Sequence, residues 1–401
     1  MDGTLADGVV RVGGDARQRF HDAHGYGRPL DRNRIELAPV EAAHLLSRGD
    51  LDAVVDASGS GSDAGPDAAR LDFRAFLART GTALRFTVYK DLRDRGFYLS
   101  PAREAWPGVD AADVGDATTD AAGAEDAAAT GNGGDDPEPG GAPARTRATD
   151  RTRSSVDFVV HPRGKGPWDD AVAYRIRVVG ERDAVAPASL GGVVLAVVDE
   201  DGELTYFDTD ADPEIGATDD APGTLPDLNL PESVDADLLD DRVVCYAADE
   251  LYESGFYGQR LFGRNADSGP LQLSLVEAAY LAQRGVLNAD PAPVADRGQA
   301  VEGERFDRRL RVYAALRDRG VIPKSGFKFG ADFRVYDAFD GVDSLGHSTD
   351  LVRVVGPDHT LHPRDLSLDV RLAGGVRKRM VFARTAANGR IRWLSVARLT
   401  P

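Results

Sequence analysis

Three segments near the end of the chain carry side chains suited to proton transfer and to the stabilisation of negative charge. Tyr336 ends the segment SGFKFGADFRVY, His347 lies within GHS, and Lys378 lies within GGVRKRMVFA. A histidine can hold a proton at neutral pH and still release it, and a lysine can stabilise an anion that forms during a reaction. Each residue alone is far more often structural than catalytic, so the prediction rests on the ordered combination.

This ordered set resembles the catalytic domain of the archaeal tRNA-splicing endonucleases, the tRNA-intron endonuclease family. The resemblance is clear over residues 265–401 and weaker over 30–210, where only the scaffold repeats. It implies an endoribonuclease that excises introns from precursor tRNA at bulge-helix-bulge structures. The alternative is a non-catalytic RNA-binding or assembly subunit of a tRNA-processing complex, and the intact set of three residues argues against it.

The resemblance also implies a mechanism. The ribose 2′-OH attacks the adjacent phosphorus without a metal ion and leaves a 2′,3′-cyclic phosphate and a 5′-OH. Tyr336 is then the base, His347 the acid for the leaving 5′-oxygen, and Lys378 the group that stabilises the phosphorane. A phenol is mostly protonated at neutral pH, so nearby cations must favour phenolate. The sequence has no Walker A motif, dinucleotide fingerprint or metal-spaced Cys/His cluster, so we expect no metal and no cofactor.

Charge near the end of the chain favours RNA binding. Residues 371–401 hold seven arginines and one lysine but no Asp or Glu, in a chain whose formal net charge is −18. Members of the family hold an extruded bulge base between two arginines, and the resemblance implies Arg371 and Arg392 for this role. Because Trp393 lies beside Arg392, the alignment leaves open which of these two residues occupies the second position. A guanidinium that stacks on a base needs no long-range field, so this contact tolerates salt.

The overall composition is acidic and poor in lysine. Asp and Glu total 66 against 48 for Lys and Arg, and only five residues are lysine. Such a balance ordinarily argues against a nucleic-acid partner, but at molar salt the Debye length falls to about 3 Å. The composition is typical of proteins from salt-loving archaea, with an acidic mesophilic protein as the alternative. The single Cys245 and the absence of a long apolar run predict a soluble, cytoplasmic protein that crosses no membrane.

The elements that must position the three residues occur twice in the chain. LAPVEAAHLLSRGDL (37–51) matches LSLVEAAYLAQRGVL (273–287), and FTVYKDLRDRG (86–96) matches LRVYAALRDRG (310–320). Apolar spacing and closing glycines predict paired helices, and the alternating residues of VDFVV, ADFRV, IRVVG and VRVVG predict strands. The predicted fold class is mixed α/β (α+β). It is a tandem duplication in which each half has a small helical N-terminal subdomain and an α/β C-terminal nuclease-like subdomain.

Two stretches rich in Asp, Gly, Ala and Pro separate these parts and predict where the domains end. The first half is expected to hold an N-terminal subdomain at 1–75 and a degenerate catalytic-like subdomain at 76–210, with a disordered insert at 108–155. A linker at 211–235 is expected to lead to the N-terminal subdomain of the second half at 236–300 and to its catalytic subdomain at 301–401.

The first copy lacks the reactive residues. Alignment of the two copies puts His161, Ala171 and Gly191 at the positions of Tyr336, His347 and Lys378, so this copy is expected to act only as scaffold. One active copy per chain and two splice sites per intron predict a homodimer, and two-fold symmetry is the commonest oligomeric arrangement.

An acidic turn in the first copy suggests how such a dimer assembles. The segment VVDEDGELTYF has the apolar–turn–apolar pattern of a hairpin, and the family assembles partly through an acidic loop at this place, which enters a basic cleft of a neighbouring catalytic unit. The resemblance therefore implies dimer-interface roles for Asp199, Glu200, Asp201 and Glu203. A solvated surface turn is the alternative.

Overall fold

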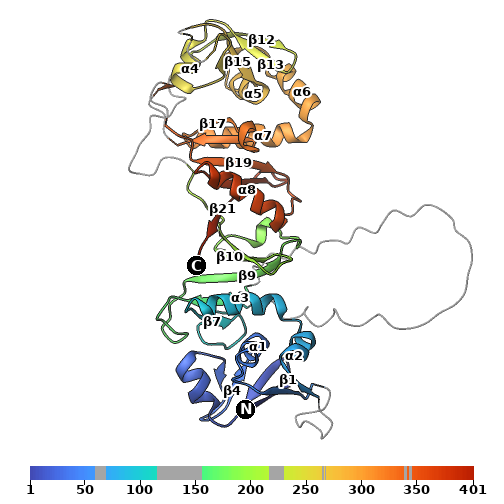
Figure 1. Ribbon diagram of the computed structural model, residues 1–401. Coiled ribbons are helices and arrows are strands. Elements are labelled where there is room, and N and C mark those ends of the chain that lie inside the picture. The colour runs from blue at the N-terminus through green and yellow to red at the C-terminus, as the bar shows by residue number, and fades with distance from the viewer. Residues whose placement is uncertain are drawn as a thin grey trace, which may run out of the picture. The chain divides into compact units, whose positions relative to one another are not determined.

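The computed structural model divides the chain into two compact units, Met1–Val178 and Val179–Pro401 (Figure 1). It describes residues 1–58, 69–114, 156–215, 230–263, 266, 268–337, 341–342 and 346–401. Most of the linker predicted at 211–235 and of the insert predicted at 108–155 lies outside the described residues. Within the described start of that insert, Asp113 is buried and forms a 2.6 Å ion pair with Arg175.

The first unit begins with a mixed sheet whose strand order is β3-β4-β2-β1-β5-β6. Its strands are β1 (Asp2–Ala6), β2 (Val9–Val12), β3 (Arg28–Pro29), β4 (Ile35–Leu37), β5 (Ala53–Asp56) and β6 (Arg70–Leu71), and its helices are α1 (Pro39–Ser47) and α2 (Phe73–Thr80). The helices predicted for this subdomain are therefore accompanied by a sheet that the sequence analysis did not predict. Its strands have only two to five residues, too few to show a clear alternation.

The rest of the first unit is a helix followed by three antiparallel strands. These elements are α3 (Ala83–Asp94), β7 (Tyr98–Pro101), β8 (Phe158–His161) and β9 (Tyr174–Gly180). Strand β8 lies between β7 and β9.

The second unit contains a hairpin from the first copy and an N-terminal subdomain from the second. The hairpin strands are β10 (Val193–Val198) and β11 (Leu204–Asp210). A five-stranded sheet follows, in the order β14-β15-β13-β12-β16. Its strands are β12 (Val234–Leu239), β13 (Arg242–Cys245), β14 (Gln259–Arg260), β15 (Leu271–Ser274) and β16 (Leu287–Asn288), and its helices are α4 (Asp249–Gly255), α5 (Leu275–Gln283) and α6 (Pro291–Glu302).

The end of the chain forms the sheet that carries the three candidate residues. Its elements are α7 (Glu304–Asp318), β17 (Ile322–Ser325), β18 (Phe333–Tyr336), β19 (Asp350–Val355), α8 (Pro363–Gly375), β20 (Arg379–Thr385) and β21 (Ile391–Leu399). Within this unit the strand order is β17-β18-β19-β20-β21-β11-β10. Strands β19 and β20 are parallel because α8 connects them, and the other neighbours are antiparallel.

Two helices cover opposite faces of this sheet (Figure 1). Side chains alternate between the faces of a strand, and Val352, Val381 and Trp393 belong to the same buried core as Phe306 and Tyr313 of α7. Met380, Phe382 and Leu394 project to the other face, which α8 covers. The sheet is therefore buried along its middle, and its strand ends are the places where polar side chains can meet a substrate.

The duplication predicted from the sequence is present in the structure. Helices α1 and α3 correspond to α5 and α7, and β8 and β9 correspond to β18 and β19. The glycines predicted to end two of these helices, Gly96 and Gly320, have φ of 88° and 78°, the left-handed conformation that a glycine adopts without strain. The fold is mixed α/β, as predicted.

Candidate active site

Tyr336, His347 and Lys378 come from the same end of three neighbouring strands. Val335 of β18 lies opposite Asp350 of β19, which lies opposite Arg379 of β20. Tyr336 directly follows Val335, Lys378 directly precedes Arg379, and His347 stands three residues before Asp350. The strand directions therefore gather all three residues at one edge of the sheet.

Hydrogen bonds connect the loop that contains His347 to both neighbouring strands. The backbone N–H of Thr349 donates to the carbonyl of Val335 at 2.9 Å, and the N–H of Arg379 donates to the carbonyl of Thr349 at 3.0 Å. The Nζ of Lys378 donates to the carbonyl of Ser348 at 2.5 Å. The Lys378 side chain is thus hydrogen-bonded to the backbone of the residue that follows His347. This bond connects Lys378 to the loop that contains His347.

The ring of Tyr336 is held in place by its surroundings. Tyr336 is 6% exposed, and its ring packs edge to face against the ring of Phe256, with the ring centroids 6.0 Å apart. The guanidinium carbon of Arg334 lies 5.6 Å from the centroid of the Tyr336 ring. His347, in contrast, is exposed. One side chain of the group is therefore fixed by packing, while the other is open to a ligand.

Cations and two aspartates, Asp337 and Asp350, together set the electrostatics at this edge. Partial burial lowers the pKa of Lys378, the charge of Arg334 lowers it further, and the carboxylate of Asp350 opposes both effects. Asp350 is 1% exposed, and its Oδ1 accepts a hydrogen bond from Nε of Arg379 at 2.7 Å. Its charge is therefore already shared with another cation.

Arg334 was not predicted from the sequence, although its guanidinium carbon lies 5.6 Å from the centroid of the Tyr336 ring. Its place two residues before Tyr336 in the same strand was the available signal, because residues i and i+2 of a strand project to the same face. Asp350 was also missed, since a lone aspartate at the start of a strand carries no distinctive pattern.

The two arginines predicted to bind RNA lie on different elements. Arg371 is exposed on α8, about one turn before that helix ends at Gly375, and Arg392 is exposed on β21 opposite Arg384. Trp393, the alternative position, is 8% exposed and lies beneath the guanidinium of Arg319, whose carbon is 4.4 Å from the ring centroid. Arg392 therefore projects to the face opposite Trp393 and is the more accessible of the two residues.

The acidic turn between β10 and β11 is partly engaged within the chain. Asp199 Oδ1 accepts hydrogen bonds from the backbone N–H groups of Asp201 and Glu203 at 3.0 Å and 2.8 Å. Glu200 forms a 2.6 Å ion pair with Arg182, which lowers the pKa of the glutamate. Asp201 and Glu203 are exposed, and their carboxylates make no ion pair with the described residues.

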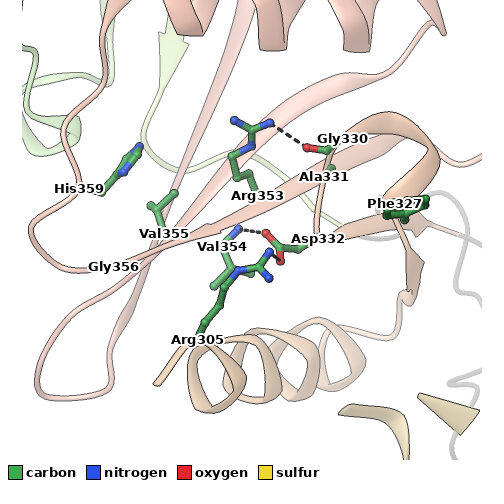
Figure 2. Close-up of a pocket in the computed structure, with 10 residues that line it drawn as sticks. All are labelled: Arg305, Phe327, Gly330, Ala331, Asp332, Arg353, Val354, Val355, Gly356 and His359. Atoms are coloured by element: carbon green, nitrogen blue, oxygen red, sulfur yellow. Dashed lines mark hydrogen bonds and ion pairs between the residues drawn. The ribbon is translucent and has the colours of Figure 1, made fainter. Parts of the chain in front are cut away.

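Figure 2 shows an open pocket of about 560 Å³ at the start of β18 and the end of β19. It therefore lies at the strand ends opposite to those that carry Tyr336 and His347. Its cations are already paired: Arg305 binds the carboxylate of Asp332, and Arg353 binds Asp369 at 2.7 Å and the carbonyl of Gly330 at 2.8 Å. The edge with Tyr336 is the better candidate for the reacting site.

Among the described residues, no group of three or more His, Cys, Asp or Glu side chains is arranged to hold a metal ion. None of the described helices combines the length and the apolar character that a membrane span requires.

Comparison with known proteins places both kinds of subdomain in one family. Residues 306–393 match the family model for the catalytic C-terminal domain of tRNA intron endonucleases, and residues 1–62 and 234–292 match the model for the N-terminal domain of the same enzymes. The first match contains Tyr336, His347 and Lys378. The second confirms that the N-terminal domain occurs in both halves of the chain.

Curated relatives match over the whole length. The tRNA-splicing endonuclease of Haloferax volcanii is 58% identical over 403 residues, and that of Natronomonas pharaonis is 51% identical over 405, each match covering 100% of both chains. The tRNA-splicing endonuclease of Methanosarcina mazei is 32% identical over 402 residues, covering 93% of this chain and 92% of the relative. This chain therefore belongs to the tRNA-splicing endonuclease family, as its sequence motifs predicted.

Proposed function

We propose that this protein is an endoribonuclease that excises introns from precursor tRNA at bulge-helix-bulge structures, with Tyr336, His347 and Lys378 as its catalytic residues. Membership of the family and full-length similarity to tRNA-splicing endonucleases support the substrate class. The observation that supports the assignment of residues is that Tyr336, His347 and Lys378 all come from the same strand ends of β18, β19 and β20.

The reaction needs only the groups present at this edge. Tyr336, as phenolate, takes the proton of the ribose 2′-OH, and the 2′-oxygen forms a bond to the adjacent phosphorus. The bond from phosphorus to the 5′-oxygen then breaks, and His347 donates a proton to that oxygen. The products are a 2′,3′-cyclic phosphate and a 5′-OH. Because the substrate supplies the nucleophile, no metal-bound water is required.

Lys378 acts on the charge that develops between these two proton transfers. The pentacoordinate phosphorane carries an extra negative charge on its equatorial oxygens, and an ammonium group fixed close to them stabilises it more than the starting phosphodiester. The hydrogen bond of Lys378 to Ser348 supports this role, because it fixes the amine beside the His347 loop.

Substrate binding and assembly involve surfaces away from the reacting groups. Arg371 and Arg392 hold an extruded bulge base by stacking, which their exposure permits. Two chains form a homodimer with one active site in each, so that both splice sites of an intron can be cut. The acidic turn between β10 and β11 docks on a basic surface of the partner, with Asp201 and Glu203 free to make new ion pairs.

Cleavage of a precursor tRNA with a bulge-helix-bulge junction tests the proposal directly. The wild-type chain is expected to cut it in excess EDTA and to leave cyclic phosphate and 5′-OH ends, identified by end labelling and mass spectrometry. Tyr336→Phe, which keeps the ring packing against Phe256, should cut at least 10²-fold more slowly. A strict requirement for Mg²⁺, or fragments that end in 3′-OH, would refute the mechanism.

A further inference from the structure

Arg334, at the candidate site, is an arginine without an ion pair to any carboxylate of the described residues. Arg334 lies in the middle of β18, is half-buried, and has its guanidinium carbon 5.6 Å from the centroid of the Tyr336 ring. Its Nε is buried and has no hydrogen-bond partner in the structure. Among the described residues no carboxylate forms an ion pair with this guanidinium.

Three other arginines of this sheet and of α7 differ from Arg334, because each forms an ion pair with an aspartate. Arg309 contacts Asp332 at 3.1 Å, Arg353 contacts Asp369 at 2.7 Å, and Arg379 contacts Asp350 at 2.7 Å. A partly buried charge without a counterion is unfavourable, because one aromatic face 5.6 Å away does not replace the hydration that it loses. Arg334 is therefore not explained as part of the ion-pair network that supports this sheet.

Further cations surround Arg334 and make its position less favourable still. Lys324 lies opposite it on β17, and the charge of Arg334 lowers the pKa of both Lys324 and Lys378. Three acids lie nearby: Glu277 is bound to Lys324 at 2.8 Å, Asp350 is bound to Arg379, and Asp337, whose pKa is raised by burial, accepts a hydrogen bond from the Thr349 hydroxyl at 2.7 Å. The free chain therefore holds an excess of positive charge beside Tyr336, and an anion from outside would balance it.

The first copy supports a link between this arginine and the chemistry. Asp157 and Phe158 correspond to Asp332 and Phe333, so the position of Arg334 is occupied there by Val159, which is fully buried. The copy without the three candidate residues thus has an ordinary core side chain at this point. The arginine is present where Tyr336 and Lys378 are present.

We propose that Arg334 is a fourth catalytic residue, whose guanidinium donates hydrogen bonds to a non-bridging oxygen of the scissile RNA phosphate. This inference rests on the endonuclease function proposed above. A planar guanidinium can donate two parallel hydrogen bonds to a phosphate, which fixes the orientation of the group as well as its charge. Arg334 and Lys378 then contact the phosphorane from β18 and from the start of β20, the strands on either side of β19.

Single-turnover cleavage of the precursor tRNA tests this role. Arg334→Met keeps a side chain of similar length without the charge, and it should reduce the rate by roughly 10²- to 10³-fold, as loss of a transition-state donor does. Arg334→Lys should cleave the precursor at least tenfold faster than Arg334→Met does. Lys328→Met is the matched control: it removes an exposed cation from the turn before the same strand, and its rate should stay within twofold of the wild type.

Two further measurements separate catalysis from folding and from binding. The thermal unfolding midpoint of Arg334→Met should equal or exceed that of the wild type, because the variant removes repulsion from Lys324 and Lys378. Affinity for the precursor, measured in a His347→Ala background, should fall by less than tenfold. Wild-type cleavage by Arg334→Met, or a lower unfolding midpoint in both Arg334 variants, overturns the role of Arg334. A wild-type chain that leaves the precursor intact refutes the endonuclease function itself.

Discussion

The two copies use the same strand end for opposite purposes. In the second copy, Tyr336 ends β18 beside the exposed His347, while in the first copy His161 ends β8 and is fully buried. The ring nitrogens of His161 make hydrogen bonds to Ser100 Oγ at 3.0 Å and to the carbonyl of Ala171 at 2.8 Å, and burial lowers its pKa. The comparison teaches that this position accommodates either a tyrosine ring packed against Phe256 or a histidine ring in a closed hydrogen-bond network.

The position of Lys378 differs between the copies for a steric reason. The hairpin β10–β11 aligns with β20–β21 through their turns, DEDGE and AANGR, and the same count places Gly191 where Lys378 stands. A Cβ atom added to Gly191 would lie 2.3 Å from the Cβ of Ala211. A lysine therefore cannot replace this glycine without a shift of the backbone, so packing as well as sequence distinguishes the first copy from the second at this position.

A buried glutamate provides a third contrast. Glu41 and Glu277 occupy equivalent places near the start of α1 and α5. Burial raises the pKa of Glu41 to about 7 despite hydrogen bonds from the backbone N–H groups of Gly27 and Ala38. Burial acts on Glu277 as well, but the ammonium of Lys324, 2.8 Å away, and backbone hydrogen bonds outweigh it and lower the pKa to about 2.

The largest expected effect separates the two strand-end positions. His347→Ala should slow cleavage of precursor tRNA by roughly 10²- to 10⁴-fold with little loss of RNA binding, because it removes a proton donor. His161→Ala should leave the cleavage rate within a few-fold but should lower the free energy of unfolding by about 1–3 kcal/mol, because Ser100 loses a buried partner. Single-turnover rates and urea titrations measure both effects. Equal rates for the two variants would remove His347 from the site.

The next effect concerns Lys324, which forms an ion pair with the buried Glu277 and has a serine, Ser100, as its counterpart in the first copy. Ser100 stands in the first copy where Lys324 stands in the second, so Lys324→Ser gives α5 the environment of α1. The substitution should destabilise the second unit by roughly 3–5 kcal/mol, because it leaves Glu277 buried without its cation. Urea unfolding followed by circular dichroism measures the loss. Arg284→Ser, which breaks an exposed ion pair with Asp318, is the control and should change stability by less than about 1 kcal/mol.

The same glutamates predict opposite responses to pH. The folded-state pKa of Glu41, about 7, lies above its ordinary value of 4.5, so its contribution to stability is present below pH 4.5 and is lost as pH rises through 7. Glu277, at about 2, contributes stability above pH 4.5 that is lost as pH falls toward 2. Each change amounts to about 3 kcal/mol.

Local measurements can follow these two titrations separately. Hydrogen exchange of α1 should accelerate between pH 5 and 8 after correction for the intrinsic rate, and exchange of α5 should not. Trp106 donates from its indole N–H to Glu41 Oε2 at 3.2 Å, so a change in its fluorescence near pH 7 would report the same titration. Parallel pH responses of α1 and α5 would contradict the difference between the two environments.

Sequence alone predicted the repeat and the main helices, because each leaves a pattern of its own, such as the periodic apolar residues of α7. Tyr336, His347 and Lys378 were predicted from the resemblance to a family, because their order within three motifs is distinctive while each residue alone is not. Arg334 escaped prediction because one arginine in a strand of an arginine-rich chain has no distinguishing pattern until its missing counterion is seen. The short strands around α1 and α5 escaped because their pairing depends on contacts distant in sequence.

The smallest expected effect concerns the acidic turn, which differs in charge from the equivalent turn AANGR of the second copy. Asp199 caps its own turn, so replacing it would disturb the hairpin as well as its surface. The sharper variant keeps Asp199 and combines Glu200→Gln, Asp201→Asn and Glu203→Gln. At molar salt each exposed ion pair contributes at most about 1 kcal/mol, so the dimer dissociation constant should rise roughly tenfold without loss of folding. Sedimentation equilibrium measures it, with Asp241→Asn in the β12–β13 turn as the control. An unchanged dissociation constant would mean that the turn is only a solvated loop, and that the partner surface lies elsewhere.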